Sequence, residues 1–127
     1  MRRRKWIIAA TIPAVLFVGW LGVRETQDRI NRQRAYPVIE SLGGRIGSIR
    51  PSLLFRGSEL RIGFHNTQFK HGEIKRLAVL RPLTSTHAVG VMFKDTNTTR
   101  QDVIELRQML PECAIFRVVE GEIQDDR

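Results

Sequence analysis

Two patterns of hydrophobic and polar positions divide the chain. Residues 6–23 read WIIAATIPAVLFVGWLGV, eighteen positions without a charge, whereas the rest alternates apolar and polar residues over short distances. A helix of that length rises about 27 Å, close to the roughly 30 Å of a bilayer's hydrocarbon core. We therefore expect residues 6–23 to form a transmembrane helix, with Trp6 and Trp20 near its ends, where interfacial aromatic residues are favoured.

A dense basic block, residues 1–5, precedes this apolar segment. A cleaved secretory signal is the main alternative to a retained anchor, because both begin with basic residues followed by an apolar run. The run exceeds the usual length of a signal and lacks a small-residue cleavage pattern before Arg24, which favours retention. Basic residues favour the cytoplasmic side, so we expect a single-pass protein of the cell (inner) membrane with residues 1–5 in the cytoplasm and the following domain outside.

Residues 24–42, RETQDRINRQRAYPVIESL, are predicted to form polar helix leaving the membrane, with residues 24–37 as a juxtamembrane stalk. Pro37 is expected to start a second short helix, because proline is tolerated in a first turn. Gly43 and Gly44 then end it, and the next residues, RIGSI, have the pattern of a strand. The folded domain is therefore expected to cover residues 38–123.

An internal repeat gives this domain its clearest pattern. Residues 60–82 align with residues 89–111 when the chain is shifted by 29 positions. The matched pairs are Leu60 with Val89, Ile62 with Val91, Phe64 with Phe93, Thr67 with Thr96, Ile74 with Val103, Leu77 with Leu106 and Pro82 with Pro111. Each unit starts with period two and ends with period three to four, which predicts a strand, a turn and an amphipathic helix.

Each predicted helix has an apolar inner face and a proline that closes it. The inner faces are Ile74, Leu77 and Ala78 in the first unit and Val103, Leu106 and Leu110 in the second. Thr99 with Asp102 three residues later is the signature of a capping box. A last strand is expected at 114–119, so the fold class is α/β, a small βαβαβ domain of parallel strands with right-handed crossovers.

A resemblance follows from the motifs of the second unit. It reads Val91-x-Phe93-x-x-Thr96-x-Thr98-Thr99 and ends Leu110-Pro111-x-Cys113-x-Ile115, and an earlier segment reads Val38-Ile39-x-x-Leu42-Gly43-Gly44. In these features residues 38–119 resemble the leucine-rich repeat, and more closely the Thr-containing units of bacterial single-pass membrane-anchored repeat proteins. The usual Asp-x-Gly of the turn is replaced by Arg100-Gln101-Asp102 and by His71-Gly72-Glu73.

The resemblance implies a truncated repeat fold. Thr67 and Thr96 would then point inward and satisfy backbone groups between turns, although both are otherwise ordinary turn residues. Because roughly three stacked repeats are generally needed for stability, residues 45–56 and 114–123 are expected to act as caps. The alternative is a domain that closes as a compact α/β unit instead of an open solenoid.

The distribution of charge along the chain limits the classes of molecule that this protein is expected to bind. The chain carries 21 Lys and Arg against 13 Asp and Glu, with eight against four in residues 24–61 and nine against nine in residues 62–127. Basic residues beside a membrane attract anionic head groups by about 1 kcal/mol each. We expect such lipid contacts from Arg2, Arg3, Arg4, Lys5, Arg24 and Arg29. The balanced charge of the folded part, with aromatic residues at core spacing, argues against nucleic acid.

Candidate chemistry is sparse. The three histidines, His65, His71 and His87, lack metal-ligand spacing, and one cysteine cannot form an internal disulfide. Cys113 follows a proline among apolar residues and is expected to be a buried structural thiol. Residues 124–127, which include Asp125 and Asp126, are expected to form a solvated tail. We expect no catalytic residue, metal, cofactor or small-molecule substrate.

Strand residues that alternate with the core positions form a candidate binding face. They are Arg61, His65, Met92, Lys94 and Arg117, with Gly63 and Gly90 between them. Leucine-rich repeats usually bind proteins through this face, so the resemblance implies an acidic protein segment or an anionic envelope polymer as partner. A solvated face without a ligand is the plain alternative.

The favoured function is a membrane-anchored, non-catalytic interaction module of the cell envelope. It rests on the predicted anchor and repeat together with the lack of a catalytic constellation. One alternative is a structural small subunit of a membrane complex, assembled through the anchor and stalk. Another is an envelope enzyme with an unrecognised site.

Overall fold

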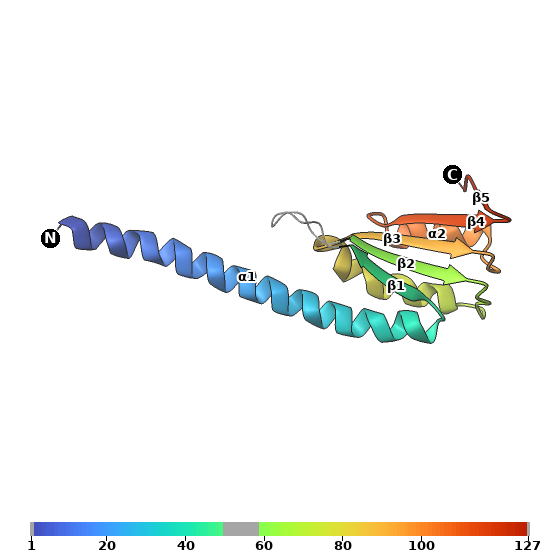
Figure 1. The fold of residues 1–127 in the computed structure, drawn as a ribbon, viewed down its shortest axis with the longest axis horizontal. Helices are drawn as coiled ribbons and strands as arrows, with labels where there is room; N and C mark the ends of the chain where they lie inside the picture. Colours follow the sequence, from blue (N-terminus) through green and yellow to red (C-terminus); the bar gives the residue numbers. More distant parts are fainter. Residues whose placement is uncertain (1, 50–58, 127) are drawn as a thin grey trace.

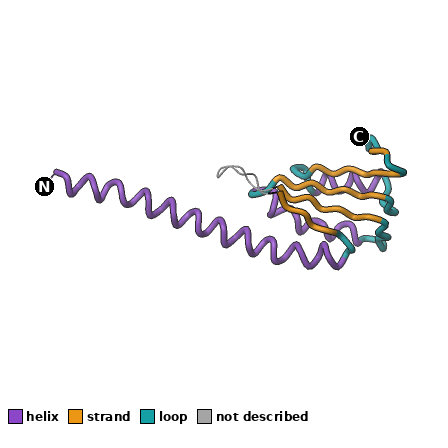
Figure 2. Tube along the Cα trace, in the orientation of Figure 1, coloured by secondary structure: helices purple, strands orange, loops and turns teal. Residues whose placement is uncertain are grey.

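The long helix α1 (Arg2–Ser41) leads into a five-stranded sheet (Figure 1). The computed structural model describes residues 2–49 and 59–126, with side chains at 11–47 and 59–126. The further elements in chain order are β1 (Arg45–Ile49), β2 (Glu59–His65), the 3-10 helix η1 (Glu73–Ser85), β3 (Ala88–Lys94), α2 (Arg100–Met109), β4 (Ala114–Val119) and β5 (Glu122–Ile123). The helices gather behind one face of the sheet, and the first half of α1 projects away from it (Figure 2).

The sheet is mixed, with strand order β1-β2-β3-β4-β5. Strands β2, β3 and β4 are parallel, as the βαβαβ prediction requires, whereas β1 pairs antiparallel with β2 and β5 pairs antiparallel with β4. The prediction of a purely parallel fold is therefore corrected: β1 runs antiparallel to β2 at one edge, and the turn at Glu120 and Gly121 returns the chain as the antiparallel strand β5 at the other. Of the two expected caps, 45–49 forms β1, residues 50–56 lie outside the described residues, and 114–123 supplies β4 and β5.

The 29-residue repeat of the sequence matches the pairing register of β2 with β3. Every β2–β3 pair joins residues 29 apart, from Glu59 opposite Ala88 to His65 opposite Lys94. In parallel strands a matched register places like side chains side by side. The rings of Phe64 and Phe93 accordingly stack with centroids 5.3 Å apart, and Phe69 meets both edge to face.

The predicted core is largely confirmed. Alternate residues of β2 and β3 are buried, whereas the residues between them are exposed or half-buried. The buried strand residues are Leu60, Ile62, Phe64, Val89, Val91 and Phe93, and Ile115 of β4 is buried with them. Burial of large apolar side chains of this kind contributes about 1.5–3 kcal/mol each.

The first repeat helix differs from the prediction because it is a 3-10 helix. Its buried residues recur every third position, at Leu77, Leu80 and Leu83, whereas Ala78 is exposed and Ile74 is only half-buried. Three residues a turn places i and i+3 on one face, which excludes Ala78 from it. Pro82 lies inside η1, so it does not close that helix.

The second repeat helix follows its sequence signals. Thr99 caps α2, accepting from the Asp102 N–H, while the Asp102 carboxylate accepts from the Thr99 N–H, so the predicted capping box is confirmed. The inner residues Val103, Leu106 and Leu110 are all buried. The helix ends at Met109, just before Pro111.

Helix α1 is continuous through Pro13 and Pro37, so the predicted start of a second helix at Pro37 is wrong. A proline inside a helix loses one hydrogen bond, and here the chain continues because Ala35 and Ile39 pack into the core on either side of it. The predicted glycine stop is confirmed. Gly43 has a φ of +87°, and a Cβ on Gly44 would lie 2.7 Å from both Ile39 and Phe64.

The first part of α1 does not meet the expectation of a membrane anchor. Among the residues whose side chains the structure describes, no helix is both long and apolar enough to cross a membrane. The prediction of a transmembrane helix at 6–23 is contradicted by this finding. The head-group contacts predicted for Arg2, Arg3, Arg4 and Lys5, and the place of Trp6, concern side chains outside the described part of the chain.

Candidate functional site

The candidate surface is the face of the sheet that the helices leave uncovered, here called the open face. Its central residues are the ones that alternate with the core positions: Arg61, Gly63 and His65 of β2, and Gly90, Met92 and Lys94 of β3. The β2–β3 register places Arg61 opposite Gly90, Gly63 opposite Met92 and His65 opposite Lys94. Four of the five predicted binding residues thus lie together.

Sequence reasoning missed two residues of the open face. Arg45 of β1 pairs with Gly63 and is exposed, and Phe116 of β4 pairs with Met92 and is half-buried. Paired residues of neighbouring strands point to the same face, so one row across the sheet reads Arg45, Gly63, Met92, Phe116. The alternating pattern of RIGSI at 45–49 predicts a strand, but it does not show that this strand pairs with β2.

The open face is basic at its ends and shallow at its centre. The side chain of Arg61 is 65% exposed and lies 2.9 Å from Glu59. His65 is exposed beside Asn66, and Lys94 lies next to it in the register. A Cβ on Gly63 would meet nothing within 4 Å, so packing within the chain does not require glycine there. Glycine weakens a strand interior and often marks a place where another molecule approaches the backbone.

Arg117 does not belong to the open face, so its predicted place among the residues of that face is wrong. It pairs in register with the buried Phe93, and therefore points to the helix side of the sheet. There its guanidinium binds Asp126 through Nε to Oδ2 at 3.1 Å and Nη2 to Oδ1 at 2.8 Å. The error arose from the link between α2 and β4, which shifts the alternation of the third strand by one residue.

Residues 124–126 do not form the predicted solvated tail, because Asp126 is held against the domain. Asp126 is only 2% exposed, and Arg107 of α2 donates to its backbone oxygen at 2.6 Å and to that of Ile115 at 2.8 Å. The hydrogen bond from Arg117 lowers the pKa of Asp126, against the opposing effect of burial, and the same bond raises the pKa of Arg117. We call this arrangement of Arg107, Arg117 and Asp126 the tail clasp.

A second polar cluster joins α1 to the end of η1. Asp28 of α1 accepts from Thr86 Oγ1 at 2.7 Å and lies 2.7 Å from His87 Nε2, and Arg32 Nε is 3.1 Å from its other oxygen. Burial alone raises the pKa of Asp28, but the hydrogen bonds from Thr86 and His87 and the charges of His87 and Arg32 outweigh it and leave that pKa below its usual range. Asp28 therefore locks the second half of α1 to the domain.

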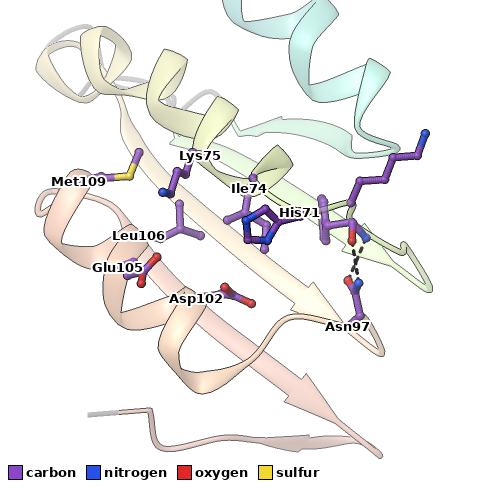
Figure 3. A pocket seen from close by; sticks show the side chains of 11 residues that line it. His71, Ile74, Lys75, Asn97, Asp102, Glu105, Leu106 and Met109 are labelled. Carbon is purple, nitrogen blue, oxygen red and sulfur yellow. Dashed lines mark hydrogen bonds between the residues drawn. The ribbon is translucent and has the colours of Figure 1, made fainter.

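A cavity of about 480 Å³ lies between η1 and α2, and sequence reasoning missed it (Figure 3). The residues that line it include His71 in the turn before η1, Ile74 and Lys75 of η1, and Asp102, Glu105, Leu106 and Met109 of α2. Its two carboxylates are already held within α2, because Asp102 completes the capping box and Glu105 accepts from Gln101. At one end, Asn97 bonds both the N–H and the oxygen of Phe69, at 2.9 and 2.8 Å.

Cys113 and the histidines His71 and His87 are the remaining groups that the sequence offered as candidates for chemistry. Burial and the nearby charge of Glu112 raise the pKa of Cys113 to about 11, so its thiol is protonated near neutral pH, as expected for a structural cysteine. His71 lies at the cavity and His87 is bound to Asp28. Within the described residues, no three His, Cys, Asp or Glu side chains lie close enough to hold a metal ion.

The hydrogen bonds of both repeat threonines join residues two positions apart, which favours their interpretation as ordinary turn residues. Thr67 Oγ1 donates to the oxygen of His65 at 3.3 Å, as an ordinary turn residue does. Thr96 Oγ1 lies 2.6 Å from Thr98 Oγ1, and Thr98, not Thr96, is the buried member of the pair.

Comparison with family models, curated proteins and solved structures finds no match to this chain.

Proposed function

We propose that this protein is a non-catalytic interaction module that binds an acidic protein segment or an anionic polymer through the open face. The observation that carries the proposal is the 29-residue register, which brings Arg61, His65 and Lys94 onto one uncovered surface of two adjacent strands. Arg45 extends the same surface on β1.

The charge of the open face supports an anionic partner. Arg45, Arg61 and Lys94 carry positive charge there, and Glu59 contacts Arg61. One exposed ion pair contributes only about 0.2–1 kcal/mol, so a single contact would not capture a partner. Several cations on one rigid sheet act together, and they also raise the rate of encounter with a negative partner.

The centre of the open face supports contact with a chain rather than with a small molecule. Met92 and Phe116 are paired in register and half-buried, and Gly63 and Gly90 leave the backbone accessible beside them. An extended segment can place acidic side chains over the cations while its own backbone approaches the glycines. The cavity between η1 and α2 lies on the helix side and takes no part in this contact.

The test is a charge reversal matched for net charge. Fluorescently labelled polyglutamate serves as the probe, and its binding to the full chain is measured by anisotropy. The double variant Arg61→Glu and Lys94→Glu is expected to bind at least about tenfold more weakly. The control, Arg76→Glu and Arg81→Glu, changes two exposed residues of η1 by the same total charge and is expected to change binding less than about threefold.

Equal losses in the two double variants would mean that polyglutamate responds to net charge alone, and the proposal would then fail. Thermal unfolding of each variant shows that the fold is retained. Because Arg61 and Lys94 lie on an uncovered face, neither substitution is expected to lower the free energy of unfolding by more than about 0.5 kcal/mol.

A further inference from the structure

Among the side chains that the structure describes, most of the exposed large apolar ones lie on the first half of α1. Eight large apolar side chains there are 43–70% exposed: Ile12, Val15, Leu16, Phe17, Val18, Trp20, Leu21 and Val23. These side chains adjoin one another along the helix, and so many large apolar residues at this exposure exceed the few hundred Å² that contiguous patches on monomeric proteins usually reach. Figures 1 and 2 show this half of the helix projecting beyond the sheet.

These side chains surround the helix instead of forming a stripe. Successive helical residues are turned by 100°, so the four consecutive exposed residues from Val15 to Val18 already face all directions. A groove on a partner protein covers only one side of a helix, as in the usual amphipathic case. The occupant of this surface must therefore enclose the helix.

The flanking charges distinguish between lipid and further copies of the chain as the surroundings of the first half of α1. The sequence places Arg2, Arg3, Arg4 and Lys5 before the apolar residues, and Arg24 and Arg29 after them. A parallel bundle of copies would bring these like charges together. An anionic lipid surface instead attracts them, and each basic residue strengthens binding to that surface by about fivefold. The charges thus favour lipid over a second copy.

The end of the apolar segment has the character of an interfacial residue pair. The guanidinium of Arg24 lies over the ring of Trp20, 5.4 Å from its centroid, and the ring of Phe17 stacks with Trp20 at a centroid distance of 6.2 Å. Tryptophan prefers the boundary between head groups and acyl chains, and an arginine next to it can reach phosphate while its stem stays in apolar surroundings.

We propose that residues 11–23 of α1 insert into the surface of a bilayer that contains anionic lipids, with Trp20 and Arg24 at the level of the head groups. Insertion requires only that the apolar side chains leave water, and it does not require the helix to cross the bilayer. The cluster around Asp28 then holds the domain at a fixed distance from the lipid surface. This inference is independent of the binding proposed for the open face.

Vesicle flotation of the full chain, synthesised in the presence of lipid, tests the proposal. Vesicles of phosphatidylcholine alone are compared with vesicles that also contain phosphatidylglycerol. Leu16→Asp places a carboxylate among the apolar residues and is expected to lower the bound fraction at least about tenfold. The matched control, Gln33→Asp, adds the same charge at an exposed position further along α1 and is expected to leave flotation unchanged.

Two further readouts identify the contacts. In a Trp6→Phe background, Trp20 emission is expected to shift to shorter wavelength with vesicles and to be quenched by brominated lipid. Arg24→Gln together with Arg29→Gln is expected to weaken binding by at least about tenfold on vesicles with phosphatidylglycerol, and far less on phosphatidylcholine alone.

Three results would overturn the proposal. The first is equal flotation of the Leu16→Asp and Gln33→Asp variants. The second is a Trp20 emission that is already shifted without lipid, together with a mass that rises with concentration in sedimentation velocity, because copies of the chain then cover one another. The third is a loss of flotation in the open-face variant Arg61→Glu and Lys94→Glu that equals the loss in Leu16→Asp.

Discussion

The tail clasp gives the sharpest test of the folded domain, through the substitution Asp126→Asn. The change keeps the size of the side chain and removes its charge. Arg117 now makes two charge-assisted hydrogen bonds to the carboxylate, at 2.8 and 3.1 Å, and its Nη1 donates weakly to the oxygen of Thr98 at 3.4 Å. After the substitution, one of the two strong bonds would face an amide NH₂ group, which cannot accept a hydrogen bond.

The magnitude follows from burial. Removing one partner of a fully buried ion pair costs about 3–5 kcal/mol, but the side chain of Arg117 is 19% exposed and can recover water. A hydrogen bond to a charged group contributes about 1.5–3 kcal/mol. We therefore expect Asp126→Asn to lower the free energy of unfolding by about 2–3 kcal/mol, equivalent to roughly 10–20 °C in Tm for a domain of this size.

The effect has a defined dependence on pH. Because Arg117 lowers the pKa of Asp126 in the folded state, the native carboxyl binds its proton less tightly than the unfolded one, whose pKa is about 3.9. The stabilisation is thus fully present above the unfolded pKa and is lost as the pH falls through the folded pKa. The difference between the parent chain and Asp126→Asn should be constant near neutral pH and shrink below about pH 4.

Urea unfolding followed by circular dichroism at several pH values measures both effects. Glu122→Gln is the control, because it removes one carboxylate at an exposed position four residues away. It should change the free energy of unfolding by less than about 0.5 kcal/mol. If Asp126→Asn is no more destabilising than Glu122→Gln at neutral pH, the reasoning is refuted.

Three further predictions concern other contacts. Asn97→Ala removes both hydrogen bonds to the Phe69 backbone and should destabilise the domain by about 2 kcal/mol in urea unfolding, whereas no change would show that water replaces them. Cys113 should react with iodoacetamide at pH 8 far more slowly than in the urea-unfolded chain, because its pKa is raised to about 11, and equal rates would contradict its burial. Asp28→Asn removes the charge bound by His87 and should speed hydrogen exchange in the second half of α1 by about tenfold, with exchange in β3 unchanged.

The repeat made the centre of the fold predictable from sequence. Period-two alternation in the two units identified β2 and β3, and their 29-residue offset became the register of the sheet. The capping box at Thr99 located the start of α2 within the chain. Each of these signals is present in the sequence itself, so it can be recognised without knowledge of the tertiary structure.

The failures occurred where tertiary contacts override a local rule. Pro37 is compatible with a helix start, but packing of Ala35 and Ile39 on the core carries α1 through it. Ala78 would lie on the buried face of an α-helix, but η1 is a 3-10 helix, in which Ala78 is exposed. In both cases the local signal is present in the sequence, but the structure that forms depends on packing against residues that are distant in sequence.

The candidate site was only partly predictable for the same reason. Arg61, His65, Met92 and Lys94 were found because alternation within one strand fixes the face of each residue. The face of Arg117 depended on the phase of a third strand after an irregular link, and its partner Asp126 lies in a segment that has no periodic pattern. The cavity between η1 and α2 arises from packing and has no signal in sequence.

The most direct test of the central claim is to map polyglutamate binding on the isotope-labelled full chain by NMR. If the open face is the binding surface, chemical-shift changes should concentrate on β2 and β3 at Arg61, His65 and Lys94 and extend to Arg45 of β1. Residues of η1 and α2, on the opposite face, should remain unchanged. Shift changes spread evenly over the basic residues of both faces, or confined to η1 and α2, would contradict the account.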